Sequence, residues 1–172
     1  MQPDRVTYTI LLAGSALWCV LILLAPICAV TPGIPRESAV LIYQFFHRVC
    51  HQIDGRSFHL LGEPLGVCIR CSAIYFSFVA GVALYPLVFS IREVRVPSRG
   101  VIIGLLAPVF LDVLAGIAGL HQPDTITRLV TGTTTGLLCA FIIVPTAVQG
   151  VRELRMQMLA SSSSTQKGQA NG

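Results

Sequence analysis

Residues Tyr8 to Val30 read YTILLAGSALWCVLILLAPICAV, an apolar run without a charged side chain. About 20 residues of α-helix are enough to cross the hydrocarbon core of a bilayer. The run is also longer than the apolar region of about 7–15 residues in a secretory signal peptide. It therefore predicts a membrane-spanning helix that stays in the protein as an anchor.

Three further apolar runs of similar length follow, so the sequence predicts an all-α polytopic bundle with four transmembrane helices. Of the 172 residues, 53% are hydrophobic and 12% are charged, whereas a soluble domain has about 25% charged residues. We expect one integral membrane domain over residues 1–158, followed by a low-complexity, disordered tail over 159–172. In the last run, Gly132 and Gly136 have the spacing that suits close helix packing. The expected spans are about 8–30, 67–89, 101–120 and 129–148.

The basic residues predict the orientation of these four spans. The positive-inside rule places the more basic loops in the cytoplasm. One side carries seven basic residues: Arg5, Arg92, Arg95, Arg99, Arg152, Arg155 and Lys167. The other side carries five: Arg36, Arg48, Arg56, Arg70 and Arg128. We therefore expect a multi-pass protein of the cytoplasmic (cell inner) membrane with both termini in the cytoplasm. The lipid bilayer is its expected partner, and no basic stripe indicates nucleic-acid binding.

A polar segment over residues 31–66 separates the first two spans. Within it, Glu37 to His51 has apolar residues at helical spacing, which predicts a short interfacial amphipathic helix. On the predicted orientation this segment faces the exterior or periplasm, where disulfides can persist.

Cysteines and histidines gather in and just after this polar segment. Cys68 and Cys71 form a CxxC where the second span begins, and residues three apart share one helical face. His47, Cys50 and His51 have spacings that place them on one face of the expected amphipathic helix. The two groups together offer four tetrahedral nitrogen and sulfur ligands, which zinc prefers. The alternative is that the histidines contact lipid headgroups and the cysteines are only packed.

Ionisable residues near the same end of the spans form a second group. Asp112 lies deep in the third span, where a carboxylate is costly and indicates function. Arg70 and Arg128 lie at the matching ends of the second and fourth spans. We expect the three to converge below the cysteines as catalytic or ligand-binding candidates. Structural pairing of Asp112 and ordinary snorkelling of Arg128 are the alternatives.

Five motifs follow one another along the chain: Cys50-His51-Gln52, Arg56-Ser57-Phe58, the Cys68 to Tyr75 run, Asp112, and the Arg128 to Gly136 run. In this order they resemble an uncharacterised prokaryotic membrane-protein family, domain of unknown function 2085. The resemblance covers about residues 46–136, and it implies four spans and the grouping of the candidate residues, but no activity. The chain departs from the family's usual pattern at two places, at Ser72-Ala73 after the CxRC motif and at Val113 after the aspartate.

Three functions fit the sequence. The first is a structural zinc site at the external membrane face, with Cys50, Cys68, Cys71 and His51 as ligands and His47 as substitute, above a polar Asp/Arg pocket for an unknown small ligand. The second is an enzyme, a quinone-linked membrane thiol–disulfide oxidoreductase that uses Cys68 and Cys71. The third is a small transporter or assembly factor. Metal content and free-thiol count separate the first two, because bound zinc and a disulfide at these cysteines exclude each other.

Overall fold

The computed structural model describes residues 3–91, 95–120 and 124–170. Arg92, which enters the charge count above, lies outside these ranges. In chain order the elements are α1 (Pro3–Val30), α2 (Arg36–His47), the 3-10 turn η1 (Asp54–Arg56), β1 (Ser57–Leu60), β2 (Glu63–Cys68), α3 (Ile69–Val88), α4 (Arg99–Ile117) and α5 (Thr125–Ala170).

Four helices of the described chain are long and apolar enough to cross a membrane, which confirms the predicted fold class. They are Asp4–Val30, Ile69–Val88, Arg99–Ile117 and Thr125–Ala160. Each overlaps one predicted span. The second helix begins at Ile69 rather than at Val67, because the preceding residues pair in a strand.

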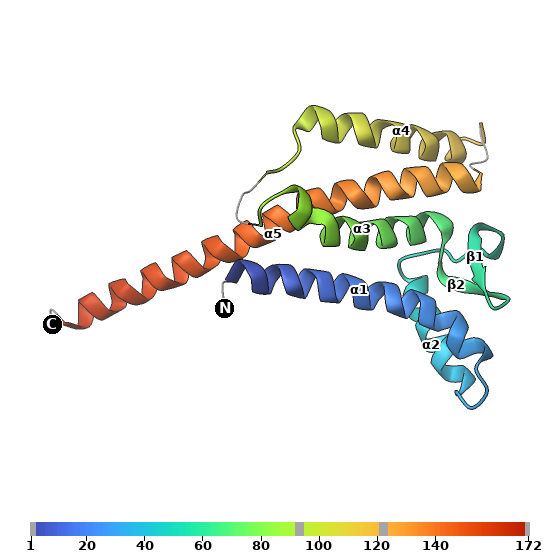
Figure 1. Ribbon diagram of the computed structural model, residues 1–172, viewed down its shortest axis with the longest axis horizontal. Coiled ribbons are helices and arrows are strands. Elements are labelled where there is room, and N and C mark those ends of the chain that lie inside the picture. The colour runs from blue at the N-terminus through green and yellow to red at the C-terminus, as the bar shows by residue number, and fades with distance from the viewer. Residues whose placement is uncertain (1–2, 92–94, 121–123, 171–172) are drawn as a thin grey trace.

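The four helices lie side by side, with α2 and the β1–β2 hairpin at one end of the bundle (Figure 1). α1 begins at the opposite end, and α5 runs on past that end. An ion pair of 2.7 Å between Asp4 and Arg152 joins α1 to α5 there. The even number of spans therefore leaves the hairpin end apart from both chain termini.

Small residues bring α3 and α5 together. A Cβ atom on Gly132 would lie 2.6 Å from the carbonyl oxygen of Arg70 and 2.7 Å from the Cβ of Ala73. A Cβ on Gly81 would lie 2.7 Å from that of Ala140. No side chain fits at these contacts, so the two backbones approach as closely as helices can. By contrast, α4 has no buried residue along its length.

A hydrophobic cluster anchors α2 and the hairpin to the bundle. Its buried members are Ile22, Phe46, Cys50, Leu65 and Val67, from α1, α2, the following loop and β2. Trp18 of α1 packs edge-on against Phe46, with ring centroids 5.2 Å apart. Burial of this surface fixes the loop that carries Cys50.

Two details of the polar segment differ from the sequence predictions. The amphipathic helix exists, but it ends at His47 instead of His51, because the amide groups of Val49 and Cys50 both turn back to the carbonyl of Phe46. The β1–β2 hairpin was not predicted. Separately, α5 is helical to Ala170, through the tail predicted to be disordered.

Candidate functional site

The hairpin determines where Cys68 lies. β1 and β2 are antiparallel, with Ser57 opposite Cys68. Cys68 is the last residue of β2 and also the residue that caps the amino terminus of α3. This register brings Arg56, which directly precedes β1, to the same end of the bundle as Cys68.

A separate set of hydrogen bonds holds Cys50 beside Cys68. The side-chain amide of Gln52 donates to the carbonyl of Tyr43 at 2.9 Å and to that of Gly66 at 2.7 Å. These two bonds join the loop to α2 and to β2. The backbone N–H of Cys68 then donates to the sulfur of Cys50 at 3.2 Å.

Three cysteines form one group. The sulfur atoms of Cys50, Cys68 and Cys71 lie within 4.8 Å of one another, with Cys50 buried and the other two partly buried. All six cysteines of the chain are free thiols. Thiolates on one zinc ion, each about 2.3 Å from the metal, lie about 3.8 Å apart in a tetrahedral arrangement. The group can therefore close around a soft metal ion with a small movement.

The electrostatics of the group favour a thiolate at Cys68. The hydrogen bond from the Cys71 thiol lowers the pKa of Cys68 to about 5, against desolvation by burial, which raises it. Further hydrogen bonds from the Cys50 thiol and from the backbone N–H groups of Arg70 and Cys71 lower the pKa in the same direction. Metal ligation and nucleophilic attack both need this deprotonated form.

The histidines are arranged differently from the sequence prediction. His47, Cys50 and His51 do not share a helical face, because α2 ends before the last two. His51 lines the cavity beside the cysteines, but its ring is not part of the three-sulfur group. His47 is exposed and is not among the cavity-lining residues. His59 pairs with Asp54 at 3.0 Å on the hairpin. His51 as fourth ligand and His47 as its substitute remain predictions.

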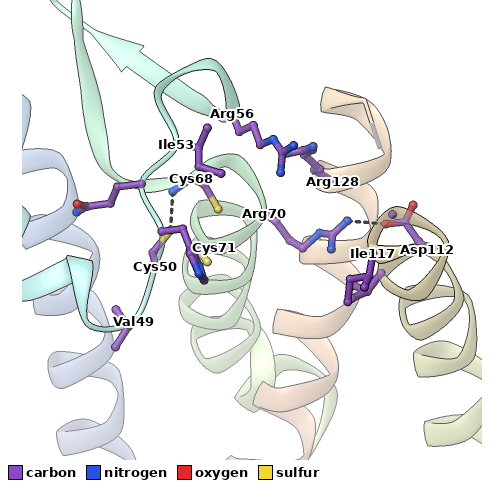
Figure 2. Close-up of a pocket in the computed structure, with 14 residues that line it drawn as sticks. Val49, Cys50, Ile53, Arg56, Cys68, Arg70, Cys71, Asp112, Ile117 and Arg128 are labelled. Carbon is purple, nitrogen blue, oxygen red and sulfur yellow. Dashed lines mark hydrogen bonds and ion pairs between the residues drawn. The ribbon is translucent and has the colours of Figure 1, made fainter. Parts of the chain in front are cut away.

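A cavity of about 440 Å³ opens beside the sulfur group. Arg70, Asp112 and Arg128, the three residues expected to converge, all line it. Nη2 of Arg70 donates to Oδ2 of Asp112 at 2.5 Å, with the two side chains 23% and 10% exposed (Figure 2). The full lining is Val49, Cys50, His51, Gln52, Ile53, Arg56, Cys68, Arg70, Cys71, Asp112, Val113, Gly116, Ile117 and Arg128.

Helix packing explains why Arg128 reaches this cavity. Gly132 holds α5 against the carbonyl of Arg70, and Arg128 lies about one helical turn before Gly132. The side-chain carboxylate of Asp124 accepts a hydrogen bond of 2.7 Å from the N–H of Thr127 and so fixes the first turn of α5. Arg128 therefore stands on a defined turn opposite Arg70.

Sequence reasoning missed two residues of the site. Arg56 lines the cavity and points toward Arg128 (Figure 2). Gln52 lines it too and fixes the loop. Both residues belong to motifs of the family resemblance, Cys50-His51-Gln52 and Arg56-Ser57-Phe58, but only the hairpin register locates Arg56 at the cavity.

Comparison with known proteins places the chain among its relatives. Residues 50–142 match the family described as "Predicted membrane protein (DUF2085)". The chain belongs to this family. The matched region starts at Cys50 and includes all the cysteine, arginine and aspartate residues of the cavity. The protein is thus a multi-pass membrane protein, as the DUF2085 resemblance implied.

Two archaeal proteins are similar to the chain. An uncharacterised protein of Methanocaldococcus jannaschii is 28% identical over 141 residues, which are 80% of this chain and 90% of that protein. An uncharacterised protein of Methanothermobacter thermautotrophicus is 29% identical over 94 residues, 54% of this chain and 81% of that protein. No solved structure matches the chain significantly. Both relatives are described only as uncharacterised proteins, so function has to be argued from the site.

Proposed function

We propose that this membrane protein binds one zinc ion through Cys50, Cys68 and Cys71, and that the ion ties the loop after α2 to the start of α3. The observation that carries the proposal is the meeting of three sulfur atoms within 4.8 Å from two separate segments. A dithiol redox site uses two cysteines, whereas a third sulfur atom beside them favours a metal site. Thiolates favour zinc and other soft ions over magnesium or calcium.

The proposed location is the exterior face of the cytoplasmic membrane, above the Asp/Arg pocket. The excess of basic residues on the side of the termini supports this orientation. The position of α2 and the hairpin at the end opposite the start of α1 agrees with it (Figure 1). Zinc itself is redox-inert, and its binding competes with disulfide formation at the same cysteines in an oxidising compartment.

Elemental analysis of the purified protein and a count of its free thiols test the proposal. We expect about one zinc per chain, lost in Cys50→Ser, Cys68→Ser and Cys71→Ser alike, because each removes a ligand. Cys139→Ser is the matched control, since Cys139 lies in α5 and outside the group. Metal-free protein with a reducible Cys68–Cys71 disulfide would overturn the zinc site.

That contrary result would support a second function, a quinone-linked thiol–disulfide oxidoreductase. The lowered pKa of Cys68 at the start of α3 favours it, because reactive CxxC cysteines share these features. In this chemistry the Cys68 and Cys71 thiols lose two electrons and two protons, a disulfide forms, and a quinone becomes a quinol. In Cys50→Ser no metal would be present to lose. A mixed disulfide would accumulate between Cys68 and a substrate thiol, formed when that thiol attacks the Cys68–Cys71 disulfide and the Cys71 thiolate leaves.

A further inference from the structure

The sulfur group and a set of arginines share one cavity. Cys50, Cys68 and Cys71 line it on one side, and Arg56, Arg70 and Arg128 come from η1, α3 and α5. In the described chain the metal-ligating group contains three residues and no fourth. A tetrahedral zinc ion held there would have one position to fill from outside this group.

The charges of the cavity are unequal. Three guanidinium groups face one carboxylate, and Asp112 is already paired with Nη2 of Arg70. Nε of Arg70 is buried and has no hydrogen-bond partner among the described residues. A zinc ion with three thiolates carries one negative charge, and Asp112 carries another. The lining of the cavity is therefore basic on one side, with three arginines beside one aspartate.

Arg56 and Arg128 present their guanidinium groups to the same part of the cavity. They belong to separate elements, yet their side chains point toward one another over the cavity (Figure 2). The planar donors of guanidinium groups match the two oxygens of a carboxylate or phosphate. The cavity also has apolar walls, formed by Val49, Ile53 and Ile117. Its volume of about 440 Å³ lies in the range of small-molecule sites.

We propose that this cavity binds an organic oxyanion, a carboxylate or a phosphate ester, that Arg56 and Arg128 grip, and that one of its oxygens completes the coordination of the metal. The ligation rests on the zinc site proposed above. An anion in this position makes the fourth ligand of the metal exchangeable. In a closed structural site the protein supplies all four ligands. The anion comes either from a soluble molecule or from a lipid headgroup, since the cavity lies at the end of the spans.

Cobalt substitution gives a direct test. The full chain is purified without zinc, loaded with Co²⁺ and placed in nanodiscs of phosphatidylcholine. Thiolate-to-cobalt charge-transfer bands report the sulfur ligands, and visible d–d bands report the fourth ligand. Titration with acetate and with inorganic phosphate should shift the d–d bands saturably while the charge-transfer bands keep their intensity. A shift already present in phosphatidylglycerol nanodiscs, without added anion, identifies a lipid headgroup as the source.

Variants connect the response to the arginines. We expect Arg56→Gln and Arg128→Gln to weaken anion binding at least about tenfold, with the charge-transfer bands unchanged. Arg36→Gln is the control, because Arg36 lies on the same side of the membrane-spanning helices at the start of α2, outside the cavity lining. In His51→Ala the anion should shift the d–d bands as it does in the unmodified chain.

The failures are distinguishable. Absence of the charge-transfer bands overturns the zinc site and the ligation together. If the charge-transfer bands are present but the d–d bands respond to neither anion nor lipid, the oxyanion proposal alone is overturned. An anion response that appears only in His51→Ala also overturns it, because His51 then holds the fourth position in the unmodified chain.

Discussion

Replacing Asp112 with asparagine tests the ion pair that joins α4 to α3. The pair spans 2.5 Å and both of its side chains are mostly buried. Asparagine keeps the shape of the side chain and one acceptor oxygen, so a hydrogen bond from Arg70 can persist. The negative charge is lost, however, and Arg70 then shares the cavity with Arg56 and Arg128 without a carboxylate.

The magnitude follows from the burial of the pair. Removing one partner of a fully buried pair costs about 3–5 kcal/mol. The exposed fraction of Arg70 and the hydrogen bond that Asp112→Asn retains both reduce this cost, so we expect a loss of about 2 kcal/mol in the free energy of unfolding. Unfolding by a denaturing detergent can be followed through Trp18, the single tryptophan, which packs against Phe46.

Asp4→Asn is the matched control for this experiment. It breaks the other described pair between an aspartate and an arginine, where the side chain of Arg152 is 40% exposed. We expect a loss of at most about 1 kcal/mol there. The double variant Arg70→Gln with Asp112→Asn should regain part of the stability, because it leaves no uncompensated charge from the pair. A loss below about 0.5 kcal/mol in Asp112→Asn would refute the assigned role of the pair.

Three other outcomes are expected. Gly132→Val should separate α3 from α5 and cost several kcal/mol in the same assay, whereas Gly104→Val, which meets no neighbour within 4 Å, should be nearly neutral. Burial, aided by the nearby carboxylate of Glu63, raises the pKa of Tyr43 to about 12. Unfolding should therefore become easier as pH rises from about 10, the unfolded value, towards 12, and Tyr43→Phe should weaken that dependence in pH-series titrations. Reporter fusions at Ser161 should be active in the cytoplasm, and fusions within residues 54–62 outside it; the reverse pattern would invert the orientation.

The spans were predictable because the bilayer imposes a simple rule on sequence. Each needs about 20 apolar residues, and four such runs are present. The hairpin was not predictable in the same way. Its turn places Leu61 and Gly62 at positive φ angles of 57° and 87°, and leucine is rarely found there. Pro64 in β2 also argues against a strand. Tertiary packing of Leu65 and Val67 into the core outweighs both signals.

The site was predicted in part, since local spacing identifies residues on one helix but not contacts between elements. Cys68 and Cys71 lie as their spacing indicated. Cys50 also lies beside them, because of the turn after α2 and the hydrogen bonds of Gln52. It does not share a helical face with His47 and His51. Arg56 entered the cavity through a strand register that no periodicity revealed.

The position of Cys50 opposite Cys68 also affects the entropy of the unfolded chain. The two residues are 18 positions apart, and any bridge between them, metal or disulfide, closes a loop that contains η1 and the hairpin. Closing a loop of about 15 residues is worth about 3 kcal/mol in the chain-entropy account. On the proposed orientation, the order of this segment would follow the conditions outside the cell, rising with the logarithm of free metal concentration if the bridge is zinc. Under the zinc proposal, chelation would loosen the segment, which the hydrophobic cluster around Phe46 still holds in part, while the four spans stay in the bilayer.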